Sequence, residues 1–270
     1  MPPFLKPSAR PEAVLNVLLV GAGKMGGALA QRWQELQICQ RLVIVEPALH
    51  IKSFKDIPAD FSPQVIVFAV KPQTLPEIVK DYQGFAGQGA LCLSIAAGKP
   101  VSFFEKYLGT KAKIVRSMPN LPASIGKGIT VAYANQNVSA AEKKMASSLL
   151  SAVGEVLWVE KEGLLNPVTA LSGSGPAYIF LLIETMTKAG MHIGLDPVMA
   201  EKLARQTVIG SAALAEASAG ISAQQLRENV TSPGGTTQAA LEVLMAQSGI
   251  QELFDRALAA ATKRAEELSG

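Results

Sequence analysis

Short apolar runs alternate with helix-forming segments over residues 14–162 of the chain. The strand-like runs occupy residues 14–20, 41–46, 65–70, 90–95, 114–118, 128–132 and 156–159. Short runs that are apolar throughout are typical of strands buried on both faces of a sheet. The segments between them carry helix signals, such as the capping box of Ser139 and Glu142. This alternation predicts an α/β domain built on a doubly wound parallel sheet.

The pattern changes after about residue 163, where strand signals stop and apolar residues recur at helical spacing. We expect helices at 175–189, 197–218, 237–247 and 250–268, the first of them buried on most sides because it is nearly uncharged. So apolar a helical block favours pairing with a second chain, and packing against the first domain is the alternative. The expected organisation is a flexible, proline-rich leader (1–13), an α/β domain (14–162) and an all-helical domain (163–270).

A glycine-rich turn joins the first strand to the first helix. The segment Gly21-Ala22-Gly23-Lys24-Met25-Gly26 follows an apolar strand directly and opens a helix, which is the context in which Gly-x-Gly-x-x-Gly binds dinucleotides. In such turns the first glycine permits the tight bend, the second lets the backbone approach a pyrophosphate, and the third allows close helix packing. The first domain is therefore expected to be a Rossmann-type dinucleotide-binding domain.

Glu46 ends the next strand, 20 residues beyond Gly26. An acid at this distance often accepts a hydrogen bond from the adenine ribose 2′-hydroxyl. A carboxylate there repels a 2′-phosphate, which favours NAD(H), whereas Lys52 and Lys55 could offset the repulsion. Both NAD(H) and NADP(H) stay open.

Two further strand ends are expected to line the cofactor crevice, because ligands of doubly wound folds bind at the carboxyl ends of strands. They are Ala69-Val70-Lys71-Pro72, where Pro72 is expected to open a helix, and the Ser94–Gly98 segment with Ala96 and Ala97.

The segment from Asn229 to Thr237 resembles an anion site, with glycines, hydroxyl groups and a following helix. The alternative is a simple helix connection in which Thr236 or Thr237 is the N-cap.

Composition narrows the class of protein. A hydrophobic content of 49% with 17% charged residues indicates a globular protein, and a net charge of +3 without basic clusters argues against nucleic-acid binding. Cys39 and Cys92 are expected to be reduced core thiols. With no export signal and no membrane span in the sequence, we expect a cytoplasmic location.

The inventory of reactive side chains limits the chemistry. His50 and His192 have no neighbouring acid or thiol in the sequence, metal-ligand spacing is missing, and no general base suited to alcohol oxidation stands out. Hydride transfer to a C=N bond fits this inventory better, because an imine can already be protonated in water.

With these residues assembled, the chain resembles the pyrroline-5-carboxylate reductase family. The resemblance rests on the following segments: Gly21–Gly26, Ala69–Pro72, Ser94–Gly98, Val115–Asn120, Leu171–Tyr178 and Thr231–Thr237. It implies a Rossmann domain followed by a helical domain that dimerises through interlocking helices, often in rings of dimers. It also implies an oxidoreductase of the last step of proline biosynthesis, which transfers hydride from NAD(P)H to the imine carbon of 1-pyrroline-5-carboxylate.

The resemblance also implies roles for individual residues. The substrate carboxylate would meet backbone N–H groups of Gly235, Thr236 and Thr237, and the Thr237 hydroxyl would hydrogen-bond the ring nitrogen. Glu162 matches a position beside the substrate. Asn229 and Asp56 match positions beside the cofactor.

One departure from the family pattern and three alternatives remain. Glu46-Pro47 replaces the small or basic residues of many relatives, which puts NADPH preference in doubt. A related imine reductase and a β-hydroxyacid dehydrogenase are alternative enzymes, and Lys188 and Lys202 are the nearest candidates for the catalytic residue of either. A non-catalytic dinucleotide sensor is the third alternative. Imine ring size, proline inhibition and oligomer number are not determined by the sequence.

Overall fold

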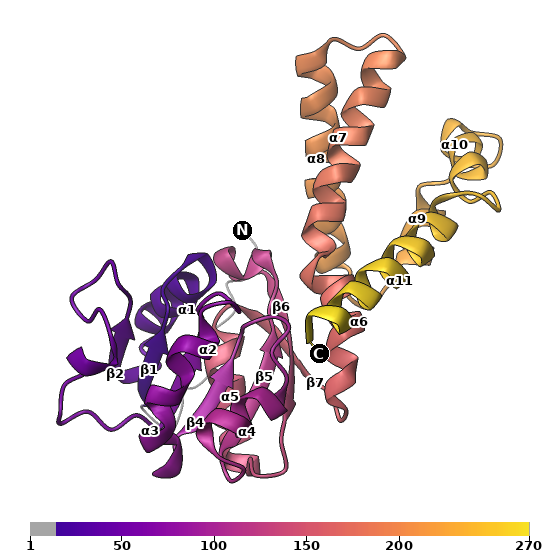
Figure 1. Ribbon diagram of the computed structural model, residues 1–270. Helices are drawn as coiled ribbons and strands as arrows, with labels where there is room; N and C mark the ends of the chain where they lie inside the picture. Colours follow the sequence, from indigo (N-terminus) through magenta and orange to yellow (C-terminus); the bar gives the residue numbers. More distant parts are fainter. Residues whose placement is uncertain (1–14, 270) are drawn as a thin grey trace. The chain divides into compact units, whose positions relative to one another are not determined.

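The computed structural model describes residues 15–269 and divides them into two compact units (Figure 1). The sheet unit contains residues 15–173 and 261–269, and the helical unit contains residues 174–260. The expected leader at 1–13 lies outside the described residues. The expected domain boundary at 162/163 stays a prediction, since the compact units divide the chain at 173 and 261.

The sheet unit is built on seven strands in the order β2-β1-β3-β4-β5-β6-β7. Neighbouring strands from β2 to β5 are parallel, and the doubly wound fold is confirmed. The strands β6 and β7 are parallel to each other, but β6 is antiparallel to β5. Between β5 and β6 the chain forms only the short helix η3 (Leu121–Ile125) and has no crossover helix, so it returns in the opposite direction. The strands are β1 (Leu15–Val20), β2 (Cys39–Val45), β3 (Val65–Phe68), β4 (Leu91–Ser94), β5 (Lys113–Met118), β6 (Gly128–Ala134) and β7 (Gly154–Trp158).

Helices cover both faces of this sheet. The helices of the sheet unit are α1 (Lys24–Glu35), α2 (Leu75–Ile78), α3 (Gln83–Gly87), α4 (Val101–Leu108), α5 (Ala140–Ser151) and α6 (Leu165–Val168), with the short turns η1 (Phe54–Asp56), η2 (Val79–Tyr82), η4 (Glu162–Leu164) and η5 (Thr169–Gly173). Alternate strand residues point to opposite faces, so Val17 and Leu19 pack with α1 and α5, whereas Leu18 and Val20 pack with α2 to α4.

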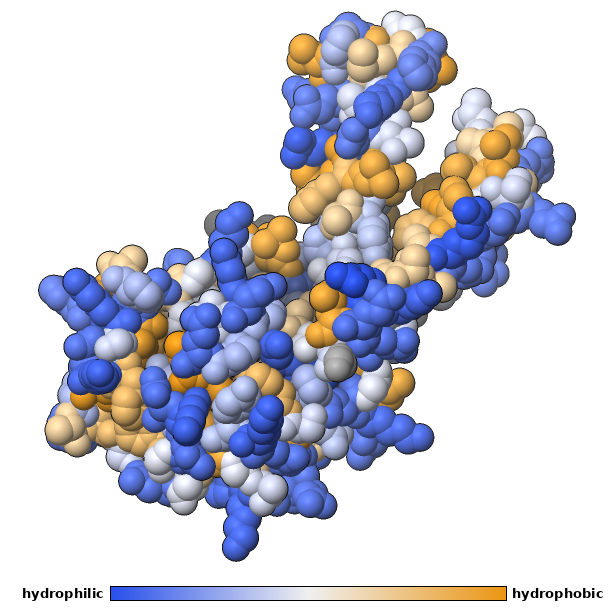
Figure 2. Space-filling model, in the orientation of Figure 1, coloured by the Kyte–Doolittle hydropathy of each residue, from blue (hydrophilic) through white to orange (hydrophobic). Residues whose placement is uncertain are grey.

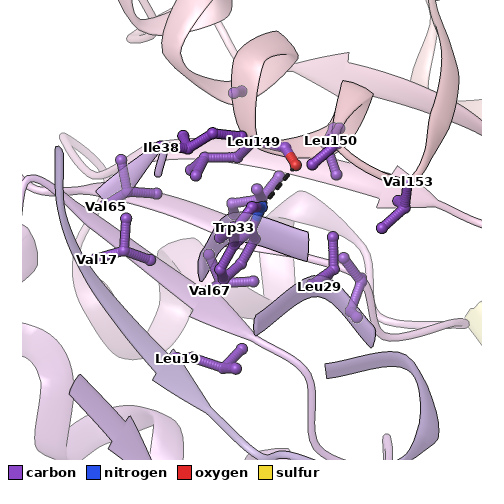
Figure 3. Packing of buried hydrophobic residues seen from close by; sticks show 14 of the residues in the cluster. Val17, Leu19, Leu29, Trp33, Ile38, Val65, Val67, Leu149, Leu150 and Val153 are labelled. Carbon is purple, nitrogen blue, oxygen red and sulfur yellow. Dashed lines mark hydrogen bonds between the residues drawn. The ribbon is translucent and has the colours of Figure 1, made fainter. Parts of the chain in front are cut away.

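A buried tryptophan ties the first face together. Trp33 of α1 is fully buried, and its indole Nε1 donates to the Leu149 carbonyl oxygen of α5 at 2.8 Å (Figure 3). This bond satisfies the only polar atom of the side chain within an otherwise apolar cluster. The helix α1 is thereby fixed to its neighbour as well as to the strand that precedes it.

Two predicted helix starts have different outcomes. The capping box of α5 is confirmed, because Glu142 N donates to Ser139 Oγ and Ser139 N donates to the Glu142 carboxylate. The helix after β3 begins at Leu75 and not at Pro72, because Thr74 N donates to the Lys71 carbonyl oxygen and closes a separate turn first. Pro72 therefore lies in a loop at the strand end.

The helical unit begins with a long pair of helices, α7 and α8, which lie side by side (Figure 1). Its helices are α7 (Gly175–His192), α8 (Pro197–Ala217), α9 (Ala223–Asn229), α10 (Thr236–Leu244) and α11 (Ile250–Ser269), the last of which ends in the sheet unit. Asp196 caps α8, accepting a hydrogen bond from Met199 N at 3.0 Å. Within residues 15–269 no helix combines the length and apolar character needed to cross a membrane.

The expected burial of the 175–189 helix is not achieved within one chain. No residue of α7 is buried, and Phe180 and Leu181 are each 59% exposed. Apolar side chains are visible on the surface of the α7–α8 pair in Figure 2. An apolar surface of this kind requires a further partner.

Candidate functional site

The glycine-rich turn lies at the carboxyl end of β1 and holds Gly21 in a left-handed conformation with φ of +95°. Gly21 N donates to the Val45 carbonyl oxygen at 2.9 Å. A Cβ on Gly21 would lie 2.8 Å from Val70 N and 2.9 Å from the Ala69 carbonyl carbon. Gly21 is therefore required by both its backbone conformation and the close approach of the β3 end.

The other two glycines of the turn have different environments. Gly26 is buried, and a Cβ there would overlap the Gly21 carbonyl oxygen and lie 3.0 Å from Ala69 Cβ. Gly23 is the N-cap of α1 and provides no side-chain cap, and a Cβ added to it would meet no atom within 4 Å. The start of α1, with Lys24 and Met25 in its first turn, thus presents uncapped N–H groups beside open space.

Glu46 lies directly beside this turn. Its Oε2 atom accepts a hydrogen bond from Ala22 N at 2.8 Å. The expected position at the end of β2 is therefore reached, and the carboxylate borders the segment on which a dinucleotide would lie.

Asp56 is exposed in η1, where its carboxylate accepts hydrogen bonds from Ser53 N and Ser53 Oγ at 2.9 Å. These bonds, with a smaller contribution from the charge of Lys52, hold the pKa of Asp56 below its ordinary value. Asp56 is thus an ionised group in a fixed local turn.

The β3 end lies next to the turn because β3 pairs with β1, and the β4 end is one strand further along the sheet because β4 pairs with β3. Ala69 N donates to the Val20 carbonyl oxygen at 2.8 Å, which sets the segment Ala69–Pro72 beside Gly21. Ala96 is buried after β4, and Ala97 is exposed. The sheet order therefore brings the predicted cofactor segments together at one edge.

A pocket of about 210 Å³ lies within the sheet unit at these strand ends. Its lining residues are Pro72, Gln73, Ala97, Gly98, Lys99, Arg116, Asn166, Thr169, Ala265, Leu268 and Ser269. Gly98 has a φ of +71°, and a Cβ there would lie 3.0 Å from the Leu268 carbonyl oxygen. The end of α11 therefore packs closely on the loop after β4.

An ion pair between a buried arginine and a partly buried glutamate adjoins this pocket. Arg116 of β5 is 5% exposed, and its Nη1 atom donates to Glu162 Oε1 at 2.9 Å. The same Oε1 atom accepts from Val101 N, the first residue of α4, at 2.8 Å. Glu162 Oε2 has no hydrogen-bond partner in the part of the chain that the structure describes. Glu162 thus joins β5 to α4 through one oxygen and keeps the other available.

The role of Arg116 was not predicted from the sequence. The residue belongs to the Val115–Asn120 segment on which the family resemblance partly rests, but no function was expected of it. The signal in the sequence was a charged residue within an otherwise apolar strand. Such a residue, when buried, needs a partner of opposite charge. The partner itself, 46 residues away in sequence, could be found only in the folded chain.

The remaining predicted site residues lie in the helical unit. Asn229 ends α9, and its Oδ1 atom accepts from Gln225 Nε2 at 3.0 Å. The N-cap of α10 is Gly235 and neither Thr236 nor Thr237, and no side chain caps this helix. The Thr237 hydroxyl has no hydrogen-bond partner among residues 15–269. The start of α10 therefore offers uncapped N–H groups and a hydroxyl to an anionic ligand.

The residues of the sheet unit fit a dinucleotide. The N-terminus of α1 has no side-chain cap, so its N–H groups can bind a pyrophosphate. The open space next to Gly23 allows a pyrophosphate to come close to the backbone. A carboxylate at the end of β2 suits a ribose hydroxyl.

Comparison with known proteins agrees with this assignment. Residues 162–268 match the family described as pyrroline-5-carboxylate reductase dimerisation. The chain is 43% identical over 205 residues to pyrroline-5-carboxylate reductase of Pseudomonas aeruginosa, covering 76% of this chain and 74% of that protein.

Solved structures give the same result. The pyrroline-5-carboxylate reductase of Coxiella burnetii superposes with a TM-score of 0.88 at 35% identity, over 96% of this chain and 100% of that one. The pyrroline carboxylate reductase of Plasmodium falciparum, solved with NADP bound, has a TM-score of 0.80 at 29% identity over 95% and 98%.

The resemblance seen in the sequence is confirmed, since the matched family, the curated relative and the superposed fold all agree with it. The matched dimerisation region contains the apolar α7–α8 pair, so the helical unit is where the chain forms a homodimer. By its similarity over most of its length, this chain belongs to the pyrroline-5-carboxylate reductase family.

Proposed function

We propose that the protein catalyses the NAD(P)H-dependent reduction of 1-pyrroline-5-carboxylate to L-proline, the last step of proline biosynthesis. The proposal rests on the membership of this chain in the family. It agrees with the two helix N-termini that no side chain caps, those of α1 and α10. One suits a pyrophosphate and the other a carboxylate. A sensor that only binds dinucleotides would have no use for the second.

When bound, the nicotinamide supplies a hydride to the imine carbon, and the electron pair of the C=N bond moves to the ring nitrogen. The protein would provide orientation in this reaction. In our proposal Gly21–Gly26, Glu46, Asp56, Ala69–Pro72, Ala96, Ala97 and Asn229 bind the cofactor. The backbone N–H groups of Gly235, Thr236 and Thr237 bind the substrate carboxylate.

Thr237 is the proposed catalytic residue. Its free hydroxyl is the group that would hydrogen-bond the ring nitrogen as the proton is held there. Glu162 is proposed to lie beside the substrate, and its free Oε2 atom is the oxygen able to contact it.

The test is oxidation of NADH and NADPH by the purified protein with 1-pyrroline-5-carboxylate as substrate. We expect turnover, and we expect Thr237→Ala to lower kcat/KM by about 1–3 kcal/mol of transition-state stabilisation. Thr237→Ser keeps the hydroxyl and should retain most of the activity. Wild-type kinetics in Thr237→Ala would refute the role of Thr237, and no turnover with either cofactor would refute the reaction itself.

Assembly and location complete the proposal. The family resemblance supports rings of dimers, and light scattering after size-exclusion chromatography would give the number of chains. We also propose a cytoplasmic location, which agrees with the free thiols of Cys39 and Cys92.

A further inference from the structure

The carboxylate of Glu46 is held in a defined orientation at the glycine-rich turn. Its Oε2 atom accepts from Ala22 N at 2.8 Å, while Oε1 has no hydrogen-bond partner within residues 15–269. One oxygen therefore fixes the side chain against the turn, and the other stays available to a hydroxyl donor. A ribose 2′-hydroxyl is such a donor, whereas a 2′-phosphate is an anionic acceptor.

The turn that follows Glu46 contains no lysine or arginine that could compensate the negative charge of its carboxylate. Glu46 N donates to the Ile51 carbonyl oxygen, and Leu49 N donates to the Glu46 carbonyl oxygen, closing a tight turn. The residues inside this turn are Pro47, Ala48, Leu49 and His50, so neither Arg nor Lys is among them. An arginine near this position is the usual means of accommodating a 2′-phosphate.

The two lysines that follow, Lys52 and Lys55, do not make the local charge near Glu46 positive. Lys52 acts electrostatically on Asp56, whose carboxylate is held in place by hydrogen bonds from Ser53. The positive charge of Lys52 is therefore partly neutralised by a local acid. Glu46 and Asp56 together match the charges of Lys52 and Lys55.

We propose that Glu46 makes the site selective for a free ribose 2′-hydroxyl, so that the enzyme uses NADH in preference to NADPH. This inference rests on the proposed function and adds to it the residue that sets the choice of cofactor. Oε1 accepts the 2′-hydroxyl, and the negative charge excludes a 2′-phosphate.

The direct test is calorimetric binding of two adenosine probes, 5′-AMP and adenosine 2′,5′-bisphosphate, to the full chain. We expect 5′-AMP to bind at least about tenfold more tightly, which corresponds to roughly 1.4 kcal/mol. The ratio of kcat/KM for NADH and NADPH should have the same sign. Equal or tighter binding of the bisphosphate by a protein with intact reductase activity would overturn the inference and leave the proposed function standing. Failure to bind either probe would overturn the inference too.

A conservative variant separates charge from hydrogen bonding. Glu46→Gln keeps an acceptor for Ala22 N and removes the negative charge, so it should raise bisphosphate affinity by roughly tenfold. Glu155→Gln changes the net charge equally, but it lies on β7 at the opposite edge of the sheet from β2 and should leave both affinities unchanged. An unaltered probe ratio in Glu46→Gln would show that Glu46 does not set the preference. If that variant does not fold, the wild-type ratio still decides.

Discussion

Gly23 and Gly26 belong to one turn, but they are glycines for different physical reasons. Gly26 is needed by the fold, because a Cβ there would overlap the Gly21 carbonyl oxygen. Gly23 has a φ of −63°, which any residue adopts, and open space around its Cα. Its lack of a side chain matters only when another group approaches the backbone.

Alanine substitutions should separate these two roles. Gly26→Ala should destabilise the protein by about 1–3 kcal/mol, because the overlap forces backbone to move. Gly23→Ala should change the unfolding free energy by less than about 0.5 kcal/mol. It should nevertheless weaken NADH binding by roughly tenfold. Urea unfolding and calorimetric titration measure the two effects, and a stable Gly26→Ala protein would contradict the packing argument.

At this scale the sequence predicted residues whose role is local. Gly21, Gly26 and Glu46 could be identified because turn, helix start and strand end are all set within a short segment. Arg116 could not, because the value of a buried charge depends on a partner that only tertiary structure supplies. The site roles of Glu162 and Thr237 came from family resemblance and stay predictions.

The helix α5 shows how an element is secured by its first turn. Glu142 accepts from Ser139 N and Ser139 Oγ, and it forms an ion pair with Lys113 of β5 at 2.6 Å. Burial raises the pKa of Glu142, but the bonds from Lys113 and Ser139 outweigh it and hold the pKa below its ordinary value. The carboxylate therefore links a helix N-terminus to the neighbouring strand.

This link should make stability depend on pH. Because the folded pKa lies below the unfolded pKa, the contribution of Glu142 is fully present above about pH 5 and is lost as pH falls through about 4.3 toward the folded value. Glu142→Gln should cost about 1–2 kcal/mol at neutral pH and progressively less in acid. Chemical denaturation across this pH range, with the exposed Glu155→Gln as control, checks it. A pH-independent difference would contradict the assigned cause.

Most helices and strands were predictable, because the spacing of their apolar residues and their capping residues lie within each element's own sequence. This holds for β1 to β5 and for α5. The reversed direction of β6 was not predictable, because direction depends on whether the preceding connection can hold a crossover helix. The start of α2 was displaced from Pro72 by the turn that Thr74 closes on Lys71, a competition that a proline signal does not reveal.

At the scale of the whole molecule, the exposed apolar helix α7 lies within the region that matches the dimerisation family. Phe180→Asp should place a charge in the homodimer interface and convert the protein to monomers, because an unpaired buried charge is strongly unfavourable. Leu36→Asp is the matched control, since Leu36 is an exposed apolar residue at the end of α1 in the sheet unit. Light scattering after size-exclusion chromatography gives the mass of each. A dimeric Phe180→Asp protein would place the interface away from this residue.

The need for a second copy was predictable from composition, since a nearly uncharged, apolar helix is unfavourable when it stays exposed to water. The path of the chain was not. Residues 261–269 cluster with the sheet although they end the last helix, and no local signal in α11 indicates that return.

This return has a consequence for the order in which the protein matures during synthesis. The strands and the glycine-rich turn leave the ribosome first, then the whole helical unit, and only afterwards Ala265, Leu268 and Ser269, which complete the wall of the pocket. Contacts between segments this distant in sequence also close slowly, because a long loop must be ordered first. A nascent chain therefore acquires its dinucleotide-binding framework well before its pocket is finished.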